Sequence, residues 1–220
     1  MSDDLTLAQS AALNTAFGAA PSSSALDEEI ARAEIYGLLS ALLYNAPTPE
    51  LLAQVRVAAT DAPAAGATLQ APWQALVHAA RTMDDAAIAN EFDALFGGVG
   101  QPEIYLYGSH YLAGFLNEKP LAALRTALMK LGLARDDAMR DTEDHVAFGC
   151  EVMRYLIAGD DAAVANLAQQ HAFFGDHLQP WVQECFDKIA AHPKASFFKA
   201  VAAFATSFFL IEQQGFDLLD

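Results

Sequence analysis

The chain has 220 residues, of which 54% are hydrophobic and 18% are charged, and its 28 acidic and 12 basic residues give a formal net charge of -16. Such an apolar composition excludes a disordered chain. A phosphate backbone would be repelled by the negative field, so we expect no nucleic-acid partner.

The first segment, residues 1–24, is expected to be flexible. Asp3 and Asp4 stand where a secretory signal peptide needs basic residues, and no apolar run approaches the roughly 18 residues of a membrane span. The two cysteines, Cys150 and Cys185, lie in apolar surroundings, which favours reduced thiols over a disulfide scaffold. We therefore expect a cytoplasmic protein without membrane insertion.

Apolar residues recur at helical spacing through most of the remaining chain. Helices are expected over 25–44, 48–59, 67–82, 84–96, 108–117, 120–132, 143–158, 161–174, 177–190 and 194–213. Thr48 and Pro49 suit the cap and first position of the second helix. No segment alternates with strand period, so the fold class is all-α, with roughly nine or ten helices in a single compact domain over 25–220.

Two stretches interrupt the helices. Gly98, Gly100 and Pro102 belong to a run that cannot form a helix interior and that re-aims the chain. This run lacks the Lys-Ser/Thr of a phosphate-binding loop. The polar connector over 134–142 is a candidate hinge between the N- and C-terminal halves.

The sequence offers little for catalysis or metal binding. His171 and His177 are six residues apart, which puts them on different helix faces, and no HExxH, CxxC or G-x-S-x-G pattern occurs. We expect no metal, no cofactor and no enzymatic activity. One alternative stays open, in which Asp144 and His145 act as an acid–base pair of a helical enzyme or nucleotide-binding protein.

The stretch Glu143-Asp144-His145 has two compatible interpretations. Asp141 or Thr142 can cap the helix expected from residue 143, with the following acids at its positive dipole end. Capping does not call for His145, however, and an exposed acid–histidine pair offers an acceptor and a switchable donor for recognition.

Three motifs resemble those of the TorD-like family, which includes the DmsD and NarJ-type proteins. They are EFDALFGGVGQP over 91–102 followed by YGSHY over 107–111, EDHVA over 143–147, and FFGDHLQPW over 173–181. Two positions depart from the family pattern. Leu106 replaces a frequent proline, and Glu143 directly precedes Asp144 where some members have E-P-x-D-H. The likeness runs from about residue 30 to 213.

The resemblance implies an all-helical redox-enzyme maturation chaperone without chemical turnover. Such a protein binds the twin-arginine leader or the apo form of a molybdenum-cofactor oxidoreductase and holds it until cofactor insertion and Tat export. Weak guanine-nucleotide binding is a possibility that the family raises, and so is a domain-swapped dimer instead of a monomer.

A receptor for such a leader needs carboxylates for the arginines and an apolar groove for the rest. We expect Glu143, Asp144 and His145 to meet the client. The groove is expected to be formed by aromatic residues: Tyr107, Tyr111, Phe92, Phe96 and Trp73. A further hypothesis is a helical partner subunit whose dimer face is the phenylalanine-rich C-terminal helix, against the simpler interpretation that this helix is core.

Overall fold

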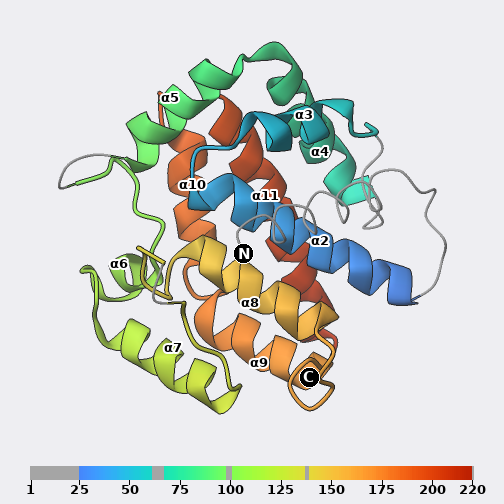
Figure 1. The fold of residues 1–220 in the computed structure, drawn as a ribbon, viewed down its shortest axis with the longest axis vertical. Helices are drawn as coiled ribbons and strands as arrows, with labels where there is room; N and C mark the ends of the chain where they lie inside the picture. Colours follow the sequence, from blue (N-terminus) through green and yellow to red (C-terminus); the bar gives the residue numbers. More distant parts are fainter. Residues whose placement is uncertain (1–24, 61–66, 98–100, 137–138, 220) are drawn as a thin grey trace.

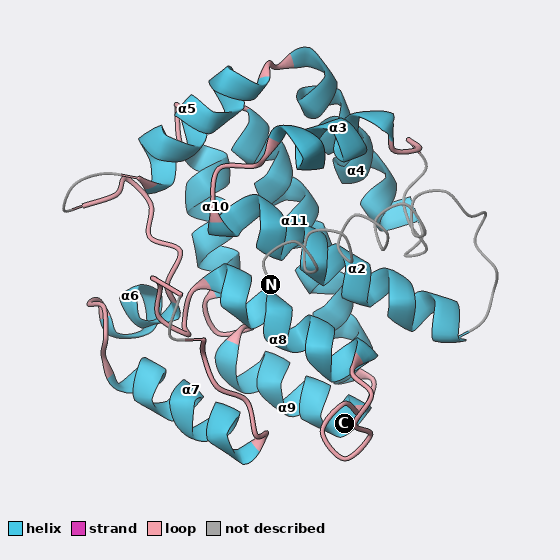
Figure 2. Cartoon of the chain, viewed as in Figure 1, coloured by secondary structure: helices cyan, strands magenta, loops and turns pink. Residues whose placement is uncertain are grey.

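The computed structural model describes residues 25–60, 67–97, 101–136 and 139–219, and all named elements in these ranges are α-helices joined by loops (Figure 2). They are α2 (Ala25–Tyr44), α3 (Pro49–Val57), α4 (Ala67–Thr82), α5 (Asp85–Phe96), α6 (Gly108–Ala113), α7 (Lys119–Lys130), α8 (Val146–Ala158), α9 (Leu167–His177), α10 (Val182–Ala191) and α11 (Phe197–Asp217). The all-α prediction is confirmed. The flexible segment expected over 1–24 lies outside the described residues.

Helix pairing across the sequence builds one core. α2 lies along α8, and α11 packs against α4 and α10 (Figure 1). Both α2 and α4 precede the polar connector over 134–142, whereas α8 and α11 follow it. The connector therefore joins parts of one core and does not separate two lobes.

The C-terminal helix α11 belongs to this core. The five phenylalanines expected at a dimer face are at most 4% exposed: Phe197, Phe198, Phe204, Phe208 and Phe209. Because burial this complete leaves no room for a partner, the hypothesis that these residues form a dimer face is wrong, and the simpler interpretation as core is confirmed.

Local capping explains where several helices begin. The Thr48 hydroxyl accepts the backbone N–H of Leu51 at 3.2 Å, with Pro49 at the first helical position, as the sequence indicates. Asp84 caps α5 in the same way. α6 is shorter than expected because Gly114 adopts a left-handed conformation with φ of 80°, which ends the helix.

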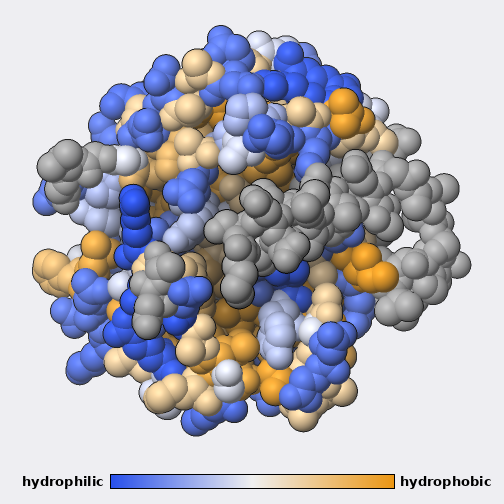
Figure 3. All heavy atoms as spheres, viewed as in Figure 1, coloured by the Kyte–Doolittle hydropathy of each residue, from blue (hydrophilic) through white to orange (hydrophobic). Residues whose placement is uncertain are grey.

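The surface is mixed in polarity. Figure 3 shows hydrophilic residues over much of one face, with hydrophobic residues gathered in its lower centre, where Figure 1 places α8 and α9. No helix in the described ranges is long and apolar enough to cross a membrane.

Candidate functional site

The first two motifs meet in space. The Gly108 N–H donates to the Asp144 carbonyl at 2.8 Å, in one of two backbone hydrogen bonds that pair Tyr107 with His145 in an isolated antiparallel bridge. Segments more than 30 residues apart in sequence are thereby fixed side by side. The bridge places residues 143–145 at the start of α8 and beside the start of α6.

Asp144 ties these segments together through its side chain. One carboxylate oxygen accepts the Ser109 backbone N–H at 2.9 Å, and the other accepts the Thr142 hydroxyl at 2.6 Å. The residue is only 6% exposed. Because both oxygens already have partners and little of the residue reaches solvent, its role in this structure is to hold the start of α6 and the end of the connector.

His145 is the N-cap of α8. Its Nδ1 accepts the Ala147 N–H at 3.1 Å, and its ring meets those of Tyr107 and Tyr44 edge-on, at 5.0 and 6.0 Å between centroids. The expectation that the helix begins at residue 143 with Asp141 or Thr142 as cap is therefore wrong. α8 begins at Val146, and the unprotonated imidazole does the capping.

The buried imidazole is held neutral. Burial lowers the pKa of His145 to about 4, against the opposing effect of the nearby Asp141 and Asp144 carboxylates. Protonation would place a proton on the capping nitrogen Nδ1, which removes the acceptor of the Ala147 N–H, and would also put a cation at the positive end of a helix. The Asp144 oxygens and His145 Nδ1 bond other groups, and the two residues are 6% and 5% exposed, which disfavours the acid–base pair of the enzyme hypothesis.

A pH titration of stability follows from this cap. The unfolded-state pKa of histidine is near 6.5, so below that pH the unfolded chain binds a proton that the folded chain does not. The stability that neutral His145 contributes is fully present above pH 6.5 and is lost as the pH falls toward 4. Between pH 7.5 and 5 we expect wild type to lose about 2 kcal/mol more stability than His145→Asn, in which asparagine keeps a cap acceptor but does not titrate. Urea unfolding at both pH values measures this difference. Equal losses in the two proteins would show that His145 is not held neutral.

Glu143 differs from its two neighbours because its carboxylate binds a half-exposed arginine. Arg125 of α7 donates to both of its oxygens, from Nε at 3.0 Å to each and from Nη2 at 2.8 Å to Oε2, and Arg135 lies 3.9 Å away. Burial alone would raise the pKa of Glu143, but the hydrogen bonds from Arg125 and from its own backbone lower it below the ordinary value. Glu143 is therefore a charged, guanidinium-binding carboxylate.

The two tyrosines flank this region. The Tyr107 hydroxyl donates to Asp141, and burial followed by this hydrogen bond raises its pKa. The Tyr111 hydroxyl donates to the Tyr105 carbonyl at 2.7 Å, and its ring stacks on Trp181 at 5.6 Å. Both tyrosines are half-buried, so part of each remains accessible beside residues 143–145.

The other aromatic residues proposed for the groove lie elsewhere. Trp73 is 0% exposed, donates to the Ala59 carbonyl at 2.8 Å and packs against Phe204 of α11. Phe92 and Phe96 are half-buried on α5 and pack edge-on against Phe198. The structure thus gathers Tyr107 and Tyr111 around residues 143–145. It leaves Trp73 in the core and Phe92 and Phe96 at the edge of the core on α5.

The first motif also contains a structural acid. Glu91 is 8% exposed, and its carboxylate accepts the backbone N–H groups of Ser196, Phe197 and Phe198 at 2.8 to 3.1 Å. These are free donors at the start of α11, whose own cap residue makes no side-chain bond. Glu91 of α5 therefore caps a helix more than 100 residues later.

The glycine loop and the connector are only partly described. Gly98 and Gly100 lie outside the described residues, and Pro102 is half-buried in the coil that follows. In the connector, Arg135 donates to the carbonyls of Met139 and Asp141. Hinge motion at the connector stays a prediction.

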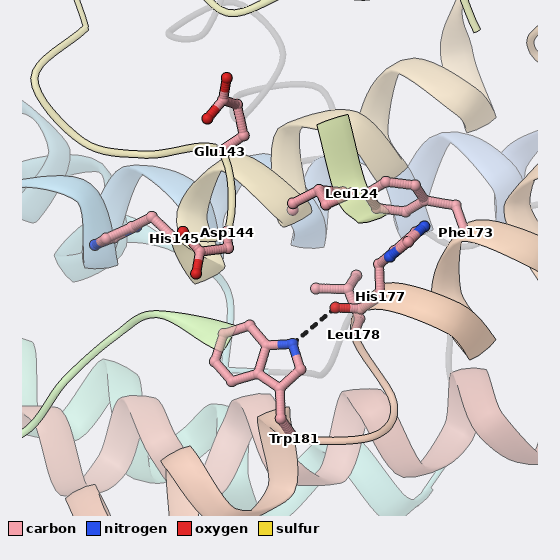
Figure 4. Close-up of a pocket in the computed structure, with 9 residues that line it drawn as sticks. Leu124, Glu143, Asp144, His145, Phe173, His177, Leu178 and Trp181 are labelled. Carbon is pink, nitrogen blue, oxygen red and sulfur yellow. Dashed lines mark hydrogen bonds between the residues drawn. The ribbon is translucent and has the colours of Figure 1, made fainter. Parts of the chain in front are cut away.

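A small pocket lies where the second and third motifs meet (Figure 4). It has room for about one water molecule, so a guanine nucleotide does not fit it as it stands. Its lining residues are Leu124, Glu143, Asp144, His145, Gly149, Phe173, His177, Leu178 and Trp181. Figure 4 shows the Glu143 side chain pointing away from the other labelled residues.

Close backbone approach explains two glycines in this region. A Cβ on Gly108 would lie 3.0 Å from the Trp181 indole nitrogen, and one on Gly149 would lie 2.6 Å from a methyl carbon of Leu178. The indole N–H donates to the His177 carbonyl at 2.7 Å. The third motif therefore packs directly on the first two.

Sequence reasoning missed several residues of this site. Arg125 lies in an ordinary amphipathic helix, and no local pattern distinguishes it from other surface arginines. Trp181 and His177 were part of the third motif, and that motif was the signal that could have placed them here. Among the described residues, no group of three or more histidine, cysteine or acidic side chains is arranged to hold a metal ion.

Comparison with known proteins agrees with the three motifs. A search of curated proteins finds no match to this chain. The family model described as nitrate reductase delta subunit matches residues 62–187, which is more than half of the chain and includes all three motifs. This family comprises molybdoenzyme maturation chaperones of the NarJ and TorD type and is not a catalytic family, so the TorD-like resemblance is confirmed. The chain belongs to the nitrate reductase delta subunit family of molybdoenzyme maturation chaperones.

Proposed function

We propose that this chaperone binds the twin-arginine leader of an apo-molybdoenzyme in the cytoplasm and holds the enzyme there until its cofactor is inserted. The observation that carries the proposal is the Glu143 carboxylate, which is charged, lines a pocket and already binds a guanidinium in a bidentate manner. A leader presents guanidinium groups of the same chemistry.

The three neighbouring residues take different roles in this proposal. Glu143 contacts the client arginine, while Asp144 and His145 hold the local backbone that presents it. The formal charge of -16 attracts a cationic leader over a longer range, and this attraction weakens as salt screens it.

The apolar part of a leader needs exposed apolar side chains. Three such residues follow Tyr111 in the chain, the first in the last turn of α6 and the other two between α6 and α7. They are Leu112, Phe115 and Leu116, which are 44%, 72% and 41% exposed. They precede the helix whose Arg125 reaches Glu143. We propose that they contact the apolar part of the leader beside residues 143–145, a place that Trp73, Phe92 and Phe96 do not share.

Calorimetry with a leader peptide tests the proposal. The peptide is a twin-arginine leader of a molybdoenzyme, with a Gln-Gln version of the arginine pair as control. We expect micromolar or tighter binding that weakens several-fold between low and physiological salt and is weakened at least tenfold by the Gln-Gln change.

Two results would count against leader recognition. Absence of binding at every salt concentration would remove it and leave binding to the mature part of the client. Equal affinity for the Arg-Arg and Gln-Gln peptides would show that the arginines are not read by a carboxylate.

A further inference from the structure

We propose that Arg125 occupies the place of a client arginine on the Glu143 carboxylate. When the client binds, its guanidinium replaces that of Arg125 on Glu143. This inference rests on the proposed function and adds a built-in competitor to it. Arg125 then sets the affinity and the selectivity of the site, because only a group that binds the carboxylate as well as a guanidinium replaces it.

The geometry of the pair is that of arginine recognition. Nε and Nη2 of Arg125 reach the two oxygens of Glu143 at 2.8 to 3.0 Å, which uses the planar fork of the guanidinium. The Glu143 side chain is 10% exposed and that of Arg125 is 49% exposed. The carboxylate is fixed in the protein, whereas its partner arrives from the solvent side.

Another bidentate pair shows what a permanent ion pair looks like in this protein. Arg32 binds Glu212 at 2.7 and 2.8 Å, with side-chain exposures of 23% and 3%. The Tyr36 hydroxyl adds a third hydrogen bond to the same carboxylate, at 3.0 Å. Because this pair is enclosed and shared with a third group, an incoming arginine cannot reach it, and the contrast points to Arg125–Glu143 as the exchangeable pair.

Exchange needs only a side-chain movement. α7 buries Leu121, Leu124 and Leu128, so the helix itself is anchored while the half-exposed Arg125 side chain is free to rotate into solvent. Removing the partner of a mostly buried carboxylate is costly, but a client guanidinium replaces that partner with an equivalent one. Arg135, 3.9 Å from Glu143, supports the carboxylate during the exchange.

The test compares two arginine substitutions against the same leader peptide. Arg125→Ala removes the competitor, and we expect it to tighten peptide binding about fivefold, since the binding-competent fraction rises when an internal competitor is lost. Arg154→Ala is the matched control, because Arg154 is also half-exposed at 42% and pairs with Glu151, within its own helix. It makes the same change in net charge, and we expect less than a twofold effect from it.

Every outcome of this comparison bears on the proposal. If both substitutions tighten binding equally, the effect is due to net charge and the inference is overturned. Weaker binding by folded Arg125→Ala also overturns it, because Arg125 would then be a positioning residue. If wild type does not bind the peptide at all, the proposed function itself fails.

A direct readout on wild-type protein avoids any folding defect of the variant. The side-chain Nε–H resonance of Arg125 in arginine-labelled protein is expected to shift toward that of free arginine on saturation with the peptide. An unchanged resonance at saturation would show that Arg125 stays on Glu143 and would overturn the exchange.

Discussion

Glu91→Ala is expected to lower the free energy of unfolding by about 3 kcal/mol, although Glu91 belongs to the motif that first suggested a client-binding role. Its carboxylate satisfies three backbone N–H groups at the start of α11, at 2.8 to 3.1 Å. The substitution leaves these donors without a partner in a mostly buried site, and each unsatisfied donor costs about 1–3 kcal/mol before the structure relaxes. Urea denaturation at neutral pH measures the loss.

Two further variants make this result specific. Glu91→Gln keeps one acceptor oxygen, and we expect it to lose about half as much stability as the alanine variant. Glu50→Ala removes an exposed acid from the first turn of α3, where only the helix dipole is affected, and we expect a loss below about 1 kcal/mol. A stable Glu91→Ala protein with impaired client binding would contradict the capping role.

The capping role of Glu91 shows which part of the fold the sequence could not predict. Helix existence and the cap at Thr48 depend on neighbours within a few residues, so periodicity and residue type were sufficient to predict them. The hydrogen bonds of Glu91 join residues more than 100 positions apart, and no local pattern carries that pairing. From the sequence, the same acid could be recognised only as part of a family motif.

The predicted start of α8 was wrong for a related reason. Asp141 and Thr142 are better caps than histidine by residue preference, which favoured a helix from residue 143. In the folded chain their side chains have other partners, since Asp141 accepts from Tyr107 and Thr142 donates to Asp144. The cap then falls to His145, which is held neutral by burial, a tertiary effect.

Aromatic residues were the least predictable part of the site. A phenylalanine or tryptophan at helical spacing gives the same pattern whether it lines a groove or fills the core, and Trp73 fills the core. Tyr107 lies at the site because it pairs with His145 in the backbone bridge, and Tyr111 lies there because its ring stacks on Trp181. Both contacts connect separate motifs, so the order of motifs along the chain predicted the site better than any single residue type.

Glu143→Gln is expected to weaken binding of the twin-arginine leader by about tenfold, and to lower stability by about 1 kcal/mol because the Arg125 pair is lost as well. The substitution keeps the shape of the side chain but removes its charge and replaces one acceptor oxygen with an NH2 donor, so the arginine contact is no longer charge-assisted or bidentate. Loss of a partner from a mostly buried charge pair costs about 2–5 kcal/mol. Because the free variant also lacks the Arg125 pair, part of this cost cancels, and a tenfold loss of affinity corresponds to about 1.4 kcal/mol. Calorimetry with the leader peptide measures the affinity, and thermal unfolding measures the stability.

Asp144→Asn and Glu151→Gln distinguish arginine binding by Glu143 from a loss of folded structure and from a change in net charge. Asp144 accepts from Ser109 and Thr142 and is 6% exposed, so its amide variant is expected to lose about 1–3 kcal/mol of stability, with near-normal affinity for each folded molecule. Glu151 pairs with an arginine on the surface of α8, and its amide variant makes the same charge change as Glu143→Gln with less than a twofold effect on affinity. If Asp144→Asn abolished binding while Glu143→Gln did not, the arginine would be read inside the pocket, because Figure 4 places the Asp144 carboxylate on the Trp181 side of Glu143.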